Sequence, residues 1–283
     1  MKILALEGGG TRGIMQSTIL ENMPFKPDLI AGTSVGSIVG GLLALAIAPD
    51  KITEFFLIQS PKIFSGGRWL FPRLWSSAKY SPDNLRTALS ALVGNATLAD
   101  CKTKFIATGF EMTTGRNAYF QSYGRSSSSG EEIVIGPDQG ALMLDVMLAS
   151  SAAQSYFPGH LIGDWLFWDG GNTGFNAPDM LALSEAKKFS NISEMSMLSL
   201  GNGLTPWPCS KQNMENPGIA TVASTTFDIA YSGPESAMVW LAQQELGMNY
   251  RRINPLIPNY AIDDARPDVL ATMIAAAQRQ LEN

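Results

Sequence analysis

The chain has 283 residues, of which 45% are hydrophobic and 16% are charged, and its formal net charge is −5. The hydrophobic content excludes a disordered chain, and the negative charge provides no general attraction to a nucleic-acid polymer. The single histidine, His160, and the two cysteines, Cys101 and Cys209, exclude the common zinc sites built from these residue types. Any Ser-His-Asp triad would have to use His160, and two cysteines so far apart in sequence favour a reducing compartment.

No targeting or membrane-spanning segment is evident in the sequence. The longest apolar run, Val35–Ala48, is interrupted by glycines and is shorter than the ~20 residues that a transmembrane helix needs. The apolar stretch near the N-terminus, Ile3–Leu6, is too short for a signal peptide. We therefore expect a cytoplasmic protein, with peripheral association to the inner face of the membrane left open.

The N-terminal part of the sequence alternates between short apolar strands and helices. Expected in chain order are a strand at Ile3–Leu6, a helix at Ile14–Met23, a strand at Asp28–Gly32 and a helix at Val35–Ala48 that Pro49 closes. Short apolar runs that end at glycines are typical of buried parallel strands. This order predicts parallel pairing and an α/β fold built in layers.

Further helices and strands are expected downstream. The helices are 81–93, opened by Ser81 and Pro82, 138–153, capped by Asp138, 235–248 and 266–281; the strands are 104–111, 132–135, 160–168 and 195–200. A flexible loop is expected at 126–130, where a run of serines is followed by glycine. No linker or internal repeat divides the chain, so we expect a single domain over residues 1–283.

The segment Gly32-Thr33-Ser34-Val35-Gly36 fits the pattern G-x-S-x-G between a predicted strand and a predicted helix. A nucleophilic serine requires that context, because it occupies a sharp turn whose flanking glycines allow close backbone approach. Ser34 would lie at a helix N-terminus, where free N–H groups and the helix dipole favour developing negative charge. The pattern therefore predicts a nucleophile, and a glycine-rich turn with a capping serine is the alternative.

A second glycine-rich turn, Gly8-Gly9-Gly10-Thr11-Arg12-Gly13, follows the first predicted strand. Its glycines also fit the dinucleotide fingerprint, which requires an acidic residue at the end of the second strand. Asp28 lies at the beginning of that strand instead, so the ribose partner is missing. The other use of such glycines is an oxyanion hole, and two adjacent parallel strands would bring both turns to the same sheet edge. We therefore expect Gly9 and Gly10 to lie near Ser34.

A third segment, Trp165-Leu166-Phe167-Trp168-Asp169-Gly170-Gly171, ends an apolar strand with an aspartate and a pair of glycines. Apolar surroundings disfavour the charged form and raise the pKa of a carboxylic acid. A carboxylate in such a place can serve as the base for a serine. A turn aspartate ahead of a glycine pair, with no part in chemistry, is the alternative.

Together these three segments resemble the patatin-like phospholipase family. Gly8–Gly13 is similar to its glycine-rich oxyanion loop, Gly32–Gly36 to its nucleophile turn, and Asp169-Gly170-Gly171 to its D-G-[GA] motif. Two further stretches resemble the family's sequence around that aspartate: Ala149–Ala153 with Phe157-Pro158, and Asn176-Ala177-Pro178. The resemblance is specific over residues 1–45 and 149–180 and is diffuse elsewhere.

This resemblance implies a three-layer α/β/α fold with a mostly parallel central sheet, and a lipid acyl hydrolase of the phospholipase A type. Ser34 would be the nucleophile and Asp169 the base of a Ser-Asp dyad that needs no histidine, metal or organic cofactor. The surrounding residues would be Gly8, Gly9 and Gly10 in the oxyanion hole, with Arg12, Gly32, Gly36, Gly170 and Gly171 in support. His160 is then expected to be structural. Arg12 would hold the glycine loop or meet a lipid phosphate, unless it is an ordinary surface residue.

Residues 61–80 contain four basic residues, no acidic residue and several aromatic side chains. Aromatic residues mixed with cations suit the boundary between acyl chains and anionic headgroups. The candidate membrane contacts are Arg68, Trp69, Phe71, Arg73 and Trp75. Glycines and a proline in the same segment are consistent with a lid that moves, and a basic loop that packs its aromatics on the core is the alternative.

Two functions from different classes remain open at this point. One is a lipid acyl hydrolase that contacts a phospholipid surface transiently; the other is a nucleotide-binding module that uses the Gly8–Gly13 turn without hydrolase activity. The missing ribose partner disfavours the second. Some bacterial members of the family that the sequence resembles are antiviral effectors activated by a cyclic nucleotide. Such an activator, and assembly into a homo-oligomer, are expectations at the level of the family.

Overall fold

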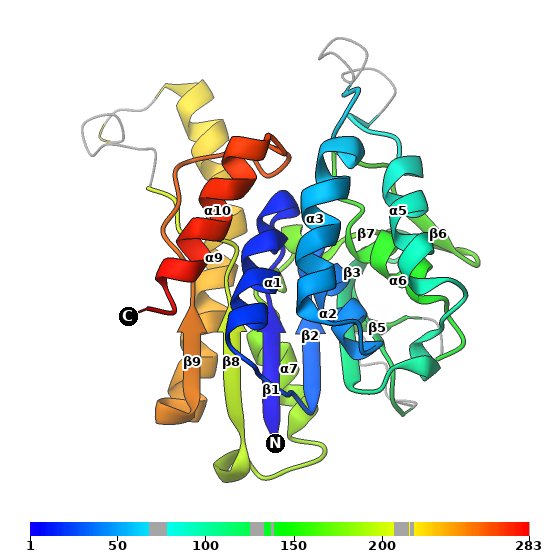
Figure 1. Ribbon diagram of the computed structural model, residues 1–283, viewed down its shortest axis with the longest axis vertical. Helices are drawn as coiled ribbons and strands as arrows, with labels where there is room; N and C mark the ends of the chain where they lie inside the picture. The colour runs from blue at the N-terminus through cyan, green and yellow to red at the C-terminus, as the bar shows by residue number, and fades with distance from the viewer. Residues whose placement is uncertain (68–77, 125–132, 137–138, 207–214, 216–217, 283) are drawn as a thin grey trace.

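The computed structural model describes residues 1–67, 78–124, 133–136, 139–206, 215 and 218–282 (Figure 1). The candidate membrane contacts Arg68, Trp69, Phe71, Arg73 and Trp75 lie outside the described residues. The same holds for the predicted loop at 126–130 and for Asp138, the predicted helix cap.

A mixed sheet runs through the middle of the molecule, with its main strands in the order β5-β4-β3-β2-β1-β8-β9. Their bounds in that order are Ile133–Ile135, Arg116–Gln121, Lys104–Glu111, Leu29–Gly32, Lys2–Leu6, Ser196–Leu200 and Tyr250–Ile253. Five adjacent strands, β3, β2, β1, β8 and β9, are all parallel to one another. At the other end, β3 pairs in antiparallel fashion with β4 and with β7 (Trp165–Asp169), which forms a hairpin with β6 (His160–Ile162).

Helices cover both faces of the sheet and complete three layers (Figure 1). One face carries α1 (Gly13–Asn22), α2 (Val35–Ala44), α3 (Pro49–Ile63), α5 (Asp83–Val93), α6 (Met143–Ser150) and α10 (Pro267–Arg279). The opposite face carries α7 (Asp179–Ala186) and α9 (Ile219–Leu246). Short 3₁₀ turns lie at Gly10–Arg12, Leu98–Asp100, Gly170–Asn172, Ile192–Glu194 and Gly247–Asn249. The predicted three-layer α/β/α class is confirmed.

The central strands are buried on both faces, which explains their unbroken apolar sequences. In β1, Leu4 and Leu6 face the larger helical layer, whereas Ile3 and Ala5 face the layer that contains α7 and α9. All four side chains are at most 1% exposed. Successive side chains of this strand point into two buried layers, so its sequence is apolar throughout and its end is marked only by the glycine turn that follows.

Several predicted boundaries are wrong, each for a local reason. The helix predicted at 35–48 ends at Ala44, and Pro49 begins a new helix, α3, because proline suits the first helical turn. The single strand predicted at 160–168 is a hairpin that turns at Gly163, where φ is +60°. The helix predicted from Asp138 begins only at Met143, and α9 begins at Ile219 rather than at Glu235.

Strands β4 and β9 were not predicted from the sequence. Both carry polar and basic residues, RNAYFQ and YRRI, that hide the usual strand pattern. Among the helices that the structure describes, none is both long enough and apolar enough to cross a lipid bilayer. The expectation of a single domain over the whole chain stays a prediction.

Candidate active site

Two glycine-rich turns meet at the carboxyl edge of the sheet, as the predicted adjacency of the first two strands requires. β1 and β2 pair in parallel, and Leu6 is in register with Gly32 at their ends. The backbones approach closely there, because a Cβ atom on Gly36 would meet the carbonyl oxygen of Leu6. Only glycine fits such an approach, which explains the glycines on both sides of Ser34.

Ser34 occupies the sharp turn between β2 and α2. Its backbone has φ 53° and ψ −123°, a sparsely populated conformation for a residue other than glycine. Its amide donates a hydrogen bond to Ser150 Oγ at 3.0 Å, and the Thr33 amide donates to the Leu6 carbonyl at 3.1 Å. These bonds hold the strained turn, and the Ser34 side chain stands at the N-terminus of a buried helix, where it lines a cavity.

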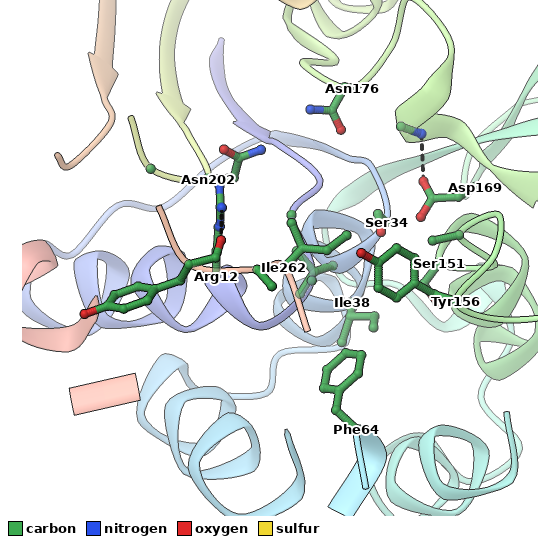
Figure 2. Close-up of a pocket in the computed structure, with 18 of the residues that line it drawn as sticks. Arg12, Ser34, Ile38, Phe64, Ser151, Tyr156, Asp169, Asn176, Asn202 and Ile262 are labelled. Atoms are coloured by element: carbon green, nitrogen blue, oxygen red, sulfur yellow. Dashed lines mark hydrogen bonds between the residues drawn. The ribbon is translucent and has the colours of Figure 1, made fainter. Parts of the chain in front are cut away.

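Asp169 is the last residue of β7 and is only 3% exposed. Its Oδ1 accepts a hydrogen bond from the Gly171 amide at 2.7 Å, and its carboxyl group lies beside Ser34 (Figure 2). Burial raises the pKa of Asp169 to about 6, although hydrogen bonds from the Ser34 hydroxyl and the Gly171 amide oppose the rise. The predicted elevation of this pKa therefore agrees with the structure, and the group is still largely ionised at neutral pH.

The glycine loop lies across the cavity from Asp169. Gly10 has φ +60°, and both Gly9 and Gly10 line the cavity together with Ser34. The Gly8 amide already donates to the carbonyl of Asn176 at 3.3 Å, so it is engaged within the fold. The oxyanion role expected of Gly8, Gly9 and Gly10 stays a prediction.

A loop from the C-terminal part of the chain clamps the glycine loop. The Thr11 amide donates to the Ile262 carbonyl at 2.8 Å, and Arg12 Nη2 donates to the Tyr260 carbonyl at 2.6 Å. A Cβ atom on Gly10 would meet the same Ile262 carbonyl. Arg12 is 9% exposed and so is not an ordinary surface residue, and its role in holding the loop stays a prediction.

The cavity has a volume of about 740 Å³. Ser34, Asp169, Asn176 and Asn202 lie around its polar end, and Ile38 and Phe64 lie along the wall that leads away from them (Figure 2). The apolar lining residues include Val35, Ile38, Phe55, Phe56, Ile63, Phe64, Leu85 and Phe157. A polar end with a serine and an apolar wall suits a ligand with an acyl carbonyl and a hydrocarbon chain.

Other features of the sequence have a structural place. His160 is not among the cavity-lining residues; its Nε2 is 2.9 Å from Asp145 Oδ1 on α6, as a structural role predicts. Asp28 accepts a hydrogen bond from the Lys2 amide at 2.7 Å, at the sheet edge opposite the glycine loop, so it does not provide the ribose partner of a dinucleotide site. In the described part of the chain, no group of three or more histidine, cysteine or acidic side chains is placed to hold a metal ion.

Sequence reasoning missed four residues that surround the glycine loop and the serine turn. They are Ser150, Asn202, Glu235 and Ile262. Ser150 lies in a stretch that resembles the family, although no role was predicted for it. The others lie in the C-terminal third, where no motif was recognised, and only their contacts in the fold reveal them.

Fold and site together define the class of the protein: it is an α/β acyl hydrolase that uses a serine, with no histidine in the described lining of its cavity. Residues 4–182 match the family model described as patatin-like phospholipase. The chain belongs to the patatin-like phospholipase family, whose members are serine-dependent lipid hydrolases.

Individual relatives differ in how much of their length this chain covers. It is 30% identical over 280 residues to a cGAMP-activated phospholipase of Pseudomonas aeruginosa (strain BWHPSA011 / Pa011), with 94% of this chain and 79% of that protein covered. It is 30% identical over 181 residues to patatin-like protein 4 of Arabidopsis thaliana, covering 55% of this chain and 43% of that protein. The crystal structure of VipD from Legionella pneumophila aligns with 99% of this chain and 66% of VipD, at 10% identity and a TM-score of 0.48, which is too distant to support an inference.

Proposed function

We propose that the protein cleaves acyl esters of membrane phospholipids, with Ser34 as nucleophile and Asp169 as its base. The observation that carries this proposal is the buried Asp169 carboxyl group beside Ser34. Burial raises the pKa of Asp169 to about 6, even with a hydrogen bond from Ser34 that opposes the rise. At neutral pH such a carboxylate is ionised, and its pKa lies near the working pH, as a base that accepts the serine proton requires.

The reaction would proceed in two acyl-transfer steps. Asp169 takes the hydroxyl proton while Ser34 Oγ bonds to the ester carbonyl carbon, and the amides of Gly9 and Gly10 stabilise the tetrahedral oxyanion. The ester C–O bond then breaks, and the leaving alcohol departs with the proton from Asp169. Water repeats the sequence on the acyl-enzyme, which releases a fatty acid and restores both side chains.

The cavity and the membrane-contact segment support a lipid substrate. An acyl chain would lie along the apolar wall that begins at Ile38, away from the ionised Asp169. Within residues 61–80, which we propose as a lid or membrane contact, Pro61–Ile63 form the end of α3, and Phe64 and Tyr80 pack edge to face with ring centroids 5.4 Å apart. The membrane contact proposed for the aromatic and basic residues between 68 and 77, including Trp69 and Phe71, rests on composition.

We extend the proposal to regulation by a cyclic nucleotide and to a role as an antiviral effector. Support comes from the Pseudomonas aeruginosa relative, which is described as cGAMP-activated and aligns with 94% of this chain. A hydrolase that attacks membrane lipids and resides with its own membrane needs restraint until it is required. Peripheral association with the inner face of a membrane, and self-assembly, are part of the same proposal.

The first experiment measures fatty-acid release from phosphatidylglycerol and phosphatidylethanolamine vesicles. Ser34→Ala and Asp169→Asn should each lower the rate by at least about 10³, because both groups act in the same step. Ser90→Ala is the matched control, since the Ser90 hydroxyl donates to the Thr87 carbonyl on helix α5, away from the cavity. Full activity in Ser34→Ala would overturn the proposal.

A second experiment tests the activator. The wild-type protein is assayed with cyclic GMP-AMP, and the mononucleotides GMP and AMP are the controls. A rise in hydrolysis with the cyclic compound alone, and its absence in Ser34→Ala, is the expected result. No response to the cyclic compound in a preparation that already hydrolyses vesicles would refute the regulatory part alone.

The membrane contact is tested by replacing Trp69 and Phe71 with serine. Vesicle binding should weaken while hydrolysis of a soluble short-chain ester stays near the wild-type rate, because the change affects the lipid boundary and not the reacting groups. Equal loss on both substrates would instead indicate that these aromatics pack on the core.

A further inference from the structure

Glu235 lies in the middle of α9, well outside the residues that match the family model. Its side chain lines the cavity, and Oε2 accepts a hydrogen bond from Asn176 Nδ2 at 2.6 Å. Burial raises the pKa of Glu235. Burying a carboxylate costs free energy unless it is hydrogen-bonded or paired with a charge. The contacts of Glu235 should therefore show why it is kept at the cavity wall.

Asn176 is the contact of interest, because it is wedged against the glycine loop. It is fully buried, and its backbone carbonyl accepts the Gly8 amide at 3.3 Å. Its Oδ1 would lie 2.5 Å from a Cβ atom on Gly8, and this oxygen has no hydrogen-bond partner among the described residues. The Asn176 side chain therefore lies close against Gly8, and a change in its orientation would alter the packing of the loop.

The chemistry of the Glu235 carboxylate sets the orientation of that amide. An ionised carboxylate only accepts hydrogen bonds, whereas an asparagine amide has a donor end and an acceptor end. Glu235 therefore holds the NH₂ group of Asn176 toward α9 and turns Oδ1 toward Gly8. Without the carboxylate, the two ends of the amide would be free to exchange places.

The other side of Gly8 is held in a parallel way. Asn202 Nδ2 donates to the Gly8 carbonyl, and the Asn202 amide donates to Glu7 Oε2 at 3.0 Å. One asparagine thus holds the N–H of Gly8 and another holds its C=O, and each is anchored by a glutamate. Gly9 and Gly10 come next in the chain, so fixing Gly8 also restricts the positions of their peptide groups.

The charges around the two glutamates are also linked. Glu7 pairs with Arg252, which donates to Ser199 Oγ at 2.8 Å, while Tyr250 donates to Asp179 Oδ1 at 2.7 Å. Burial and the nearby negative charges of Glu235 and Asp179 raise the pKa of Glu7 to about 8, although Arg252 opposes the rise. The raised pKa favours a proton on Glu7, which lessens the negative charge of the cluster beside the glycine loop.

From these contacts we infer that Glu235 is a positioning residue for hydrolysis, acting through Asn176 to set the glycine loop that stabilises the oxyanion. The inference rests on the proposed function. It assigns a catalytic consequence to α9, a helix in which no motif of the family was recognised. Glu235 takes part in neither proton transfer nor bond formation, so its effect should appear in the rate of the chemical step rather than in substrate binding.

The test compares Glu235→Ala, Glu235→Leu and Glu235→Gln on a soluble p-nitrophenyl ester. We expect the first two to lower kcat by about 10- to 100-fold with KM nearly unchanged, because an oxyanion donor is displaced only in part. Glu235→Gln keeps an acceptor for Asn176 Nδ2 in the same place and should restore most of the rate. Glu245, ten residues further along the same helix, forms an exposed ion pair with Lys187, so Glu245→Gln should behave as wild type.

Folding is separated from positioning by active-site titration with a fluorophosphonate probe, which counts reactive serines in each preparation. A kcat per labelled site equal to wild type in Glu235→Ala and Glu235→Leu would overturn the inference, as would failure of Glu235→Gln to recover activity. Either result would leave the proposed function standing if Ser34→Ala is inactive. An active Ser34→Ala would refute the proposed function itself.

Discussion

The amide of Ser34 donates a hydrogen bond to Ser150 Oγ at 3.0 Å, across 116 residues of sequence. Ser150 is fully buried at the end of α6, so its hydroxyl has no access to solvent. The bond stabilises the strained φ of 53° at Ser34 and joins the serine turn to the segment that leads toward Asp169. It is the support for the serine turn that comes from the α6 side.

Ser150→Ala should therefore weaken the serine turn without removing a reacting group. We expect a loss of about 1–3 kcal/mol in the free energy of unfolding, because the buried Ser34 amide is left unsatisfied. The rate of hydrolysis should fall with it, as the hydroxyl is no longer held in one geometry. Urea unfolding and ester hydrolysis measure the two effects, and an unchanged stability would contradict the assignment.

Gly10 and Gly66 form a matched pair for testing the glycine loop. Both have positive φ, 60° and 65°, but a Cβ atom on Gly10 would meet the Ile262 carbonyl, whereas one on Gly66 has nothing within 4 Å. Gly66→Ala should cost only the backbone strain, about 1–2 kcal/mol. Gly10→Ala should add a steric clash and nearly abolish hydrolysis. Similar activity in the two variants would show that the loop tolerates movement there.

The activity should depend on pH through Asp169. A base must be ionised to accept the serine proton, so kcat/KM should rise with pH and level off above the pKa of about 6. If another group is the base, the fall in kcat/KM at low pH should not be centred near pH 6. Measurements on a soluble ester between pH 4.5 and 8 keep the lipid surface out of the titration.

Asp169→Asn should make the folded protein more stable above pH 6 while it removes activity. The folded pKa of about 6 exceeds the ordinary 3.8, so the folded state holds the proton more tightly and loses stability as pH rises from about 4 to 6. A neutral amide avoids this cost, and its Oδ1 can still accept the Gly171 amide. We expect a gain of about 1–3 kcal/mol in urea unfolding at pH 8 and little difference at pH 4.

His160→Ala should leave hydrolysis within about twofold of wild type, because surface and packing changes away from a site have small effects on it. The ring contacts Asp145 at 2.9 Å and, as a hydrogen-bond partner, lowers the pKa of that carboxyl. Its loss should reduce stability by about 1–2 kcal/mol. A large fall in kcat at unchanged stability would bring His160 back as a catalytic candidate.

Local sequence was sufficient for the parts of the site that lie on central strands. Leu6 and Gly32 end buried central strands whose apolar residues leave little choice of structure, and the glycines mark where the backbones meet. The neighbouring strands β1 and β2, and the shared edge of their turns, could therefore be predicted. The resemblance to a known family then linked Asp169 to Ser34 over a distance that no local pattern covers.

The supports of the site could not be predicted in the same way. Glu235 lies in a helix of which only the second half was predicted, and Tyr260 and Ile262 lie in a loop with no recognisable pattern. Glu235 contacts Asn176 across 59 positions, and the carbonyls of Tyr260 and Ile262 hold Arg12 and Thr11 across more than 200 positions. Propensity and periodicity do not encode such contacts. The polar strand β9, which supplies Arg252 to the cluster at Glu7, was missed for a related reason.

The clamp on the glycine loop has a consequence for the timing of synthesis. Thr11 is made before the Ile262 carbonyl that holds it, which follows 251 positions later in the chain. A nascent chain would carry the serine turn, and later Asp169 as well, before the carbonyl that holds the glycine loop has been made. We expect ester hydrolysis to reach its full rate only when residues 260–262 have folded against the glycine loop, because their carbonyls hold Thr11 and Arg12.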